Sequence, residues 1–193
     1  DIFMQLQGIP IAAVASDFDG TILKNNTQLP PPRFFEAVHE LFKQNIPFIA
    51  ASGRQYANLR HLLSPIADRI SYIAENGCLV VHQGKVVHKR TIERSLAMEL
   101  IRDMLSQPGG ELLISGENTG YTVTGNQEFI TLLLEKIHYH MTLLTDYEQI
   151  PEDILKMSIY WKDGIPPLPK KWFHEKYDSL LQVADGGNGW LYF

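Results

Sequence analysis

Cysteine is almost absent from this chain: Cys78 stands alone among 193 residues, so no disulfide can form within it. A chain without disulfides suits a reducing compartment, and we expect it in the cytoplasm. Long apolar runs are missing too, because no stretch approaches the roughly 20 residues that a membrane-spanning helix needs. These absences argue against a disulfide-stabilised scaffold and against a membrane partner.

Positive charge is also scarce. The chain has 17 Lys and Arg against 22 Asp and Glu, a formal net charge of −5, and no run rich in lysine or arginine. Nucleic-acid-binding surfaces are usually basic, so we expect no nucleic-acid partner. The rest of the composition is ordinary for a globular protein, with 45% hydrophobic and 20% charged residues. The length allows one large domain or two small ones.

The most informative segment is residues 17–21, which read Asp-Phe-Asp-Gly-Thr. They follow an apolar run, residues 9–15, that predicts a buried strand. Two carboxylates at a strand's carboxyl end, Asp17 and Asp19, would lie in the crevice where open α/β sheets bind ligands. One acid can attack as a nucleophile while the other transfers protons, and both can help to hold a hard cation. Gly20 permits a sharp turn, and Thr21 offers a hydroxyl and an amide to an anion. The pattern predicts phosphoryl-transfer chemistry.

Two later strands are predicted to deliver polar turns to the same sheet edge. Residues 46–51 form an apolar run that leads into Ser-Gly-Arg at 52–54, and residues 71–74 lead into Glu-Asn-Gly at 75–77. A helix predicted after the prolines at 30–32 joins the first two strands into a βαβ unit. Strands in such a unit are parallel, so Ser52 should arrive beside Asp17.

Residues 17–21 resemble motif I of the haloacid dehalogenase superfamily of phosphohydrolases, and the two later turns look most like its Cof-type, or sugar-phosphatase-like, branch. The resemblance implies an α/β fold with a Rossmann-like parallel-sheet core over residues 1–78, incomplete at its C-terminal side. Residues 79–185, whose strands are predicted to be mostly antiparallel, would form an inserted α+β cap of the C2 type. Residues 186–193 would begin the return to the core.

The resemblance also implies roles for particular residues. Asp17 would be the nucleophile that becomes an aspartyl phosphate, and Asp19 would protonate the leaving alcohol and then activate water. Mg²⁺ would be the cofactor, held by Asp17, the backbone carbonyl of Asp19 and a later acidic residue. The hydroxyl of Ser52 would bind a phosphate oxygen, with Gly53 allowing close approach of the backbone.

Each later turn also has a plainer interpretation. A serine after a strand is often only a helix cap, and Arg54 is equally a phosphate ligand or a surface residue in a helix's first turn. Asn-Gly is a common turn dipeptide, so residues 75–77 form a turn by default. The functional hypothesis puts Asn76 near the leaving group, with Glu75 shaping the loop.

Part of the family pattern is missing from this sequence. In the family a later lysine steadies the aspartyl phosphate and a Gly-Asp-x-x-Asn-Asp turn completes the Mg²⁺ site. Here no such turn occurs, and no lysine follows Lys176. We expect a fragment or a natural truncation, and poor hydrolysis by the 193 residues alone.

The resemblance implies that the complete protein is a Mg²⁺-dependent phosphatase that acts on small phosphorylated metabolites, with sugar phosphates as candidate substrates. A catalytically silent module that binds a phosphorylated ligand, and a phosphomutase, are the alternatives. Substrate identity and oligomeric state stay open.

Overall fold

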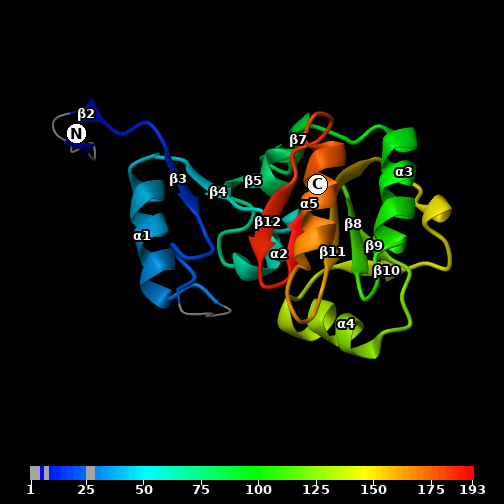
Figure 1. Cartoon of the computed structure of the whole chain (residues 1–193). Coiled ribbons are helices and arrows are strands. Elements are labelled where there is room, and N and C mark those ends of the chain that lie inside the picture. The colour runs from blue at the N-terminus through cyan, green and yellow to red at the C-terminus, as the bar shows by residue number, and fades with distance from the viewer. Residues whose placement is uncertain (1–4, 7–8, 25–28) are drawn as a thin grey trace. The chain divides into compact units, whose positions relative to one another are not determined.

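The computed structural model describes residues 5–6, 9–24 and 29–193, and its contacts divide the chain into two compact units, Asp1–Arg90 and Thr91–Phe193 (Figure 1). The first unit contains a five-stranded sheet in the order β3-β4-β5-β6-β7. Its strands are β3 (Val14–Asp17), β4 (Phe48–Ala51), β5 (Ser71–Ala74), β6 (Leu79–His82) and β7 (Lys85–Lys89). The first three are parallel, as the βαβ pattern predicts, and the last two continue the sheet as an antiparallel hairpin.

Helix α1 (Pro32–Lys43) connects β3 to β4, and α2 (Tyr56–Leu62) connects β4 to β5. A proline opens α1, where its missing N–H costs nothing, and Val38 and Leu41 are buried on one side of the helix. The ring of Phe34 meets Phe18 edge-on at 5.9 Å and Phe48 edge-on at 5.6 Å. These ring contacts hold α1 against the turn that follows β3 and against β4.

The first strand differs from the prediction. Residues 9–15 do not form one buried strand: β3 starts at Val14, and β2 (Ile9–Pro10) pairs instead with β1 (Gln5–Leu6). Pro10 cannot donate to a longer ladder, which accounts for a break near it. No residue of β3 is fully buried, and β4 is its only partner among the described strands.

The boundary between the units also differs from the prediction. A division after residue 78 is replaced by one after Arg90, because the hairpin β6–β7 belongs to the first sheet. Leu79 and Val81 are each 1% exposed and extend the apolar face of β5. Burying those side chains favours pairing with β5 over membership of the following segment.

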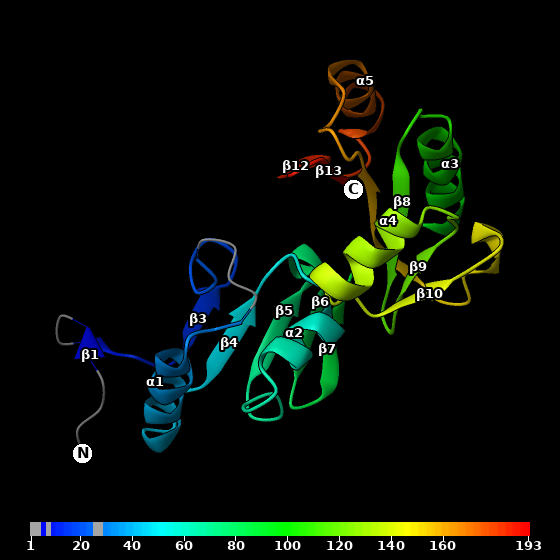
Figure 2. The same ribbon diagram turned by 90° about the horizontal axis from the view of Figure 1, so that it is seen from below.

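The second unit has a six-stranded sheet in the order β10-β9-β8-β11-β13-β12, seen from two directions in Figures 1 and 2. Its strands are β8 (Glu111–Gly116), β9 (Gly120–Thr122), β10 (Met141–Leu143), β11 (Ile154–Tyr160), β12 (Ala184–Gly187) and β13 (Trp190–Tyr192). All neighbours are antiparallel except β9 and β10, which confirms the predicted α+β character.

Helices cover the two faces of this second sheet unequally. Helices α3 (Arg94–Leu105) and α5 (Pro167–Tyr177) pack on one face through Leu100, Met104, Phe173 and Tyr177, which are fully buried. A smaller cluster on the other face joins Leu113 to Phe129 and Leu133, from α4 (Gln127–Thr131) and the π-helical turn that follows it (Leu132–Lys136). The larger core therefore lies under α3 and α5.

Two further elements complete the second unit, and its last strand differs from the prediction. Helix α4 continues into the π-helical turn that ends at Lys136, and β10 follows at Met141. Strand β12 starts at Ala184. Residues 190–192 do not return to the first sheet, because β13 pairs with both β11 and β12 and Leu191 is fully buried in the second unit's core.

Candidate active site

The two aspartates lie where β3 ends and the chain turns sharply. Asp17 is the last residue of β3, paired with Ala51 of β4. Phe18 is fully buried and anchors the turn, while the side chains of its neighbours on either side stay exposed. The carbonyl oxygen of Phe18 accepts the backbone N–H groups of residues 21, 22 and 23 at 2.8–3.3 Å, and Gly20 takes a φ of +82°. This closed turn presents both carboxylates to solvent at the carboxyl end of the sheet.

Thr21 and Ser52 each donate a hydroxyl to one of these carboxylates. Thr21 Oγ1 lies 3.4 Å from Asp17 Oδ2, and Ser52 Oγ lies 3.5 Å from Asp19 Oδ2. Ser52 follows β4 directly, and its backbone N–H donates to the carbonyl of Ile73. Its hydroxyl also accepts the backbone N–H of Arg54, whereas the residue that caps α2 is Gln55. Ser52 therefore is not the helix cap of its plainer interpretation.

Arg54 makes the strongest contact of the site. Its Nε lies 2.9 Å from Asp19 Oδ2 and its Nη2 lies 2.7 Å from Asp19 Oδ1, which is a two-pronged ion pair. The remaining nitrogen, Nη1, donates to Asn58 Oδ1 at 3.1 Å. The arginine side chain is 22% exposed and precedes α2, so it is not a surface residue of the helix's first turn.

The third turn, Glu75–Gly77, has an unusual backbone. Its three residues take positive φ angles of 50°, 56° and 91°, a left-handed conformation that costs energy for non-glycine residues. Backbone hydrogen bonds join it to the second turn, from Glu75 N–H to the Arg54 carbonyl and from Asn76 N–H to the Ser52 carbonyl. Asn76 is exposed and Glu75 is buried. The two turns thus form one hydrogen-bonded unit.

The seven residues that the sequence predicts for catalysis or for binding of phosphate and metal all lie in this one region. Asp17 is linked to Thr21, Asp19 to Ser52 and Arg54, and Gly53 to Asn76. Sequence reasoning missed Asn58, whose side chain is 2% exposed and meets Arg54. Its position four residues after an arginine at a helix start was the only available signal.

The oxygen donors present fit a magnesium ion in part. Mg²⁺ prefers oxygen ligands, keeps several waters and is bound through one or two carboxylates plus phosphate oxygens. Asp17 and Asp19 offer exposed carboxylates on one short turn. Within the described ranges no cluster of three or more His, Cys, Asp or Glu residues forms a ready-made metal site. The site as it stands would supply the Asp17 carboxylate and the Asp19 backbone carbonyl, and would leave the remaining ligands to water and substrate.

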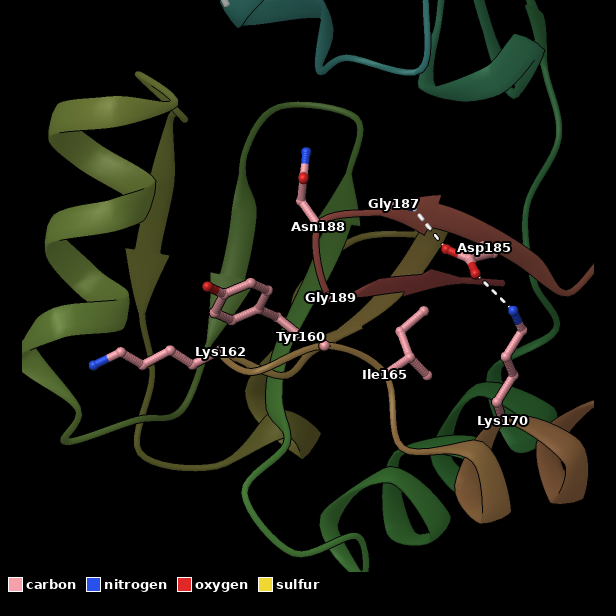
Figure 3. Close-up of a pocket in the computed structure, with 9 residues that line it drawn as sticks. Tyr160, Lys162, Ile165, Lys170, Asp185, Gly187, Asn188 and Gly189 are labelled. Carbon is pink, nitrogen blue, oxygen red and sulfur yellow. Dashed lines mark hydrogen bonds and ion pairs between the residues drawn. The ribbon is translucent and has the colours of Figure 1, made fainter.

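The second unit holds a separate cavity of about 580 Å³, where the end of β11, the start of α5 and the β12–β13 turn meet (Figure 3). Its charged side chains are already paired with protein groups. Lys170 lies 2.6 Å from Asp185, and Lys162 lies 2.6 Å from Glu128. The ammonium group of Lys170 lowers the pKa of Asp185. None of the residues predicted for the site lines this cavity.

Comparison with known proteins decides the family. The sequence model of the haloacid dehalogenase-like hydrolases matches residues 14–191, which is nearly the whole chain. The chain belongs to this hydrolase family. The resemblance read from residues 17–21 is therefore confirmed, and so is the α/β fold class.

Individual relatives resemble the chain at moderate identity. The 5-amino-6-(5-phospho-D-ribitylamino)uracil phosphatase YbjI of Escherichia coli is 26% identical to this chain over 93% of its length. The match covers 66% of YbjI, so this chain spans just under two thirds of that protein. A solved structure from Eubacterium rectale has a TM-score of 0.79 at 22% identity, over 94% of this chain and 69% of the other. The subclass IIB sugar phosphatase BT4131 has a TM-score of 0.76 at 17% identity, over 93% and 68%. This chain has the same fold as the two solved structures.

No helix in the described part of this chain is long and apolar enough to cross a membrane.

Proposed function

We propose that this chain carries part of the active site of a Mg²⁺-dependent phosphatase of small phosphorylated metabolites. The main support for this proposal is that two carboxylates, a hydroxyl and a guanidinium lie together at one sheet edge. Arg54 holds Asp19 at 2.7 Å, and Ser52 Oγ lies 3.5 Å from the same carboxylate. Membership of a hydrolase family, and a relative named as a phosphatase, support the same chemistry.

The first chemical step would transfer the phosphoryl group to the protein. A carboxylate oxygen of Asp17 forms a bond to phosphorus while the bond from phosphorus to the ester oxygen breaks. Asp19, in its protonated form, gives its proton to the departing alkoxide, which leaves as an alcohol. The product is an aspartyl phosphate on Asp17.

The second step would return the protein to its starting state. Water attacks the phosphorus of the aspartyl phosphate, and Asp19 accepts a proton from that water. The bond between Asp17 and phosphorus then breaks, which releases inorganic phosphate and restores both acids. Dividing the reaction in this way replaces one difficult displacement by two easier ones.

Asp17 and Asp19 are the residues that would hold a magnesium ion. When bound, the ion would offset the repulsion between a carboxylate nucleophile and a phosphate dianion. The hydroxyls of Ser52 and Thr21 would bind phosphate oxygens, because each already lies within hydrogen-bond distance of one of the two acids.

Arg54 has two candidate acceptors in this scheme. Its two-pronged contact with Asp19 is the geometry in which guanidinium also binds phosphate. We infer that an incoming phosphate competes with Asp19 for this edge of the guanidinium. Substrate binding would then release Asp19 for proton transfer, and Arg54 would neutralise the phosphate.

The experiment is a phosphate-release assay with Mg²⁺ on the purified chain. Three substrates are tested: a hexose phosphate, ribose 5-phosphate and 5-amino-6-(5-phospho-D-ribitylamino)uracil. The third is the compound in the name of the Escherichia coli relative. Asp17→Asn keeps the size of the nucleophile and removes its charge. Asp68→Asn is the matched control, because the Asp68 side chain is 86% exposed and pairs with Arg60 instead.

Each result has a distinct meaning. Release that Asp17→Asn abolishes and Asp68→Asn leaves intact supports the proposal, and an isomeric phosphate ester in place of free phosphate would identify a phosphomutase. Thermal stabilisation by inorganic phosphate with Mg²⁺, without turnover, would replace the phosphatase with the silent binding module. Phosphate release that Asp17→Asn leaves unchanged would overturn the assignment of the nucleophile.

We also propose a reducing, cytoplasmic location, which suits a chain with a single cysteine.

A further inference from the structure

The buried polar residues of the first unit are concentrated beneath the candidate site. Among its described residues, the polar side chains under 9% exposed are Ser52, Gln55, Asn58 and Glu75. All four belong to the second and third turns or to the first turn of α2. Burying polar groups is unfavourable unless they make hydrogen bonds, so a buried polar group that does make one holds its partner in a defined place. This layer is therefore a candidate for fixing the residues above it.

Arg54 is the residue that the layer holds at several points. Its backbone N–H donates to Ser52 Oγ at 3.2 Å, and its carbonyl accepts Glu75 N–H at 3.0 Å. These two bonds fix the main chain at position 54. They leave the long arginine side chain free to rotate about its own bonds.

Asn58 supplies the contact that fixes the side chain. Its Oδ1 accepts Nη1 of Arg54 at 3.1 Å, and Asn58 is 2% exposed on the third residue of α2. A guanidinium is planar, so fixing one terminal nitrogen and the main chain restricts where the opposite edge can point. The opposite edge, made of Nε and Nη2, is the one that meets Asp19.

We propose that Asn58 is a positioning residue, which orients the guanidinium of Arg54 so that its Nε–Nη2 edge faces Asp19 and an incoming phosphate. Asn58 itself touches neither phosphate nor metal. Its effect on ligand binding passes entirely through Arg54. The inference rests on the proposed function for the phosphate role of Arg54, but the orientation of the guanidinium can be measured without it.

The competing explanation is that Asn58 only stabilises α2. That role predicts a lower melting temperature in any variant that lacks the amide, with no particular effect on Arg54. Asn58→Leu keeps a buried side chain of similar size and removes the acceptor. Asn58→Asp keeps an acceptor oxygen for Nη1 and tests for rescue. His61→Ala, at an exposed position of the same helix, is the matched control.

The test combines phosphate binding with a spectroscopic signal from Arg54. Calorimetry with inorganic phosphate and Mg²⁺ gives a dissociation constant for wild type, Asn58→Leu, Arg54→Ala and the double variant. The Nε–H resonance of Arg54 in ¹⁵N-labelled protein, assigned by its disappearance in Arg54→Ala, reports the ion pair with Asp19. Thermal melts of every variant show whether it is folded.

Asn58→Leu is expected to shift and broaden the Arg54 resonance and to weaken phosphate binding by about three- to tenfold, the net scale of one ordinary hydrogen bond. Asn58→Asp restores the resonance, and His61→Ala leaves both readouts as in wild type. With Arg54 already replaced by alanine, Asn58→Leu changes the phosphate affinity by less than about twofold, because coupled residues are not additive.

Three results separate failure of the inference from failure of the proposed function. An unchanged Arg54 resonance in folded Asn58→Leu overturns the positioning role. An equal loss of phosphate affinity in the presence and absence of the arginine overturns it as well. If Arg54→Ala leaves phosphate affinity unchanged, the proposed phosphate role of Arg54 fails, while a perturbed resonance in Asn58→Leu still supports the positioning of its guanidinium.

Discussion

Gly53 lies directly against the side chain of Asn76: a Cβ built at position 53 would fall 2.3 Å from Asn76 Oδ1. The two residues come from different turns, one after β4 and one after β5. Any side chain larger than hydrogen at position 53 would therefore displace the asparagine. Because the turns are also joined by backbone hydrogen bonds, this contact fixes where an exposed amide lies at the sheet edge.

Gly53→Ala tests what that contact does. The obstructing atom is the end of an exposed side chain, so we expect unfolding stability to fall by no more than about 1 kcal/mol while the asparagine moves aside. Affinity for inorganic phosphate with Mg²⁺, measured by calorimetry, should fall several-fold. Gly125→Ala is the matched control, since a Cβ there meets nothing within 4 Å. Unchanged phosphate affinity in Gly53→Ala would show that the placement of Asn76 does not matter for the ligand.

Tyr177 joins α5 to α3 in the second unit. Its ring is fully buried, its hydroxyl donates to Asp103 Oδ2, and burial raises the pKa of the hydroxyl. Tyr177→Phe removes the hydroxyl and leaves the partly buried carboxylate of Asp103 with one partner fewer. We expect a loss of about 1 kcal/mol in unfolding free energy, the typical net value of such a bond.

Tryptophan fluorescence during urea unfolding measures that loss, because all three tryptophans lie in the second unit. Lys171→Ala serves as the control on the same helix, where an exposed pair with Glu175 should contribute little. A Tyr177→Phe variant as stable as wild type would mean that water satisfies Asp103 Oδ2 as well as the tyrosine hydroxyl does.

Two exposed ion pairs make the second unit sensitive to acid. Lys162 lowers the pKa of Glu128, and Lys170 lowers the pKa of Asp185. A carboxyl whose pKa is lower in the folded state stabilises that state above its unfolded pKa of about 4 and loses the contribution as the pH falls through the folded value. We therefore expect the urea midpoint, followed by tryptophan fluorescence, to decline below about pH 4.5.

The double variant Glu128→Gln with Asp185→Asn supplies the control for this pH dependence. Its decline with acid should be smaller than that of wild type, and salt should reduce the difference because both pairs are exposed. Identical pH profiles for the two proteins at low salt would rule out a contribution from these pairs.

Local pattern was enough for the site but not for the assembly of strands. The meeting of Asp17, Ser52 and Asn76 could be predicted because each lies at or just beyond the end of a parallel strand, and parallel strands end at one edge. The sequence alone could not assign the hairpin at residues 79–89 or the strand at 190–192 to its sheet. A strand's own sequence shows that one face is apolar, but which apolar surface covers it depends on the rest of the fold.

Asn58 shows the same limit for a side chain. In sequence it is one polar position in a short helix whose apolar residues are Tyr56, Leu59 and Leu62. Only the structure shows that it is buried and that its amide faces the arginine four residues earlier. Pairwise contacts of this kind depend on rotamers, which periodicity does not describe.

Asn76 has two possible roles that a matched pair of variants separates. Its φ of +56° favours glycine or asparagine, and its side chain lies at the sheet edge against Gly53. Asn76→Gly relaxes the backbone, whereas Asn76→Ala forces a Cβ into the left-handed region at a cost of about 1 kcal/mol. Both remove the amide. If the amide contacts the ligand, the two variants lose phosphate affinity equally, although only the alanine variant melts at a lower temperature. Affinity lost in step with stability, with the glycine variant binding like wild type, would reduce Asn76 to a turn residue.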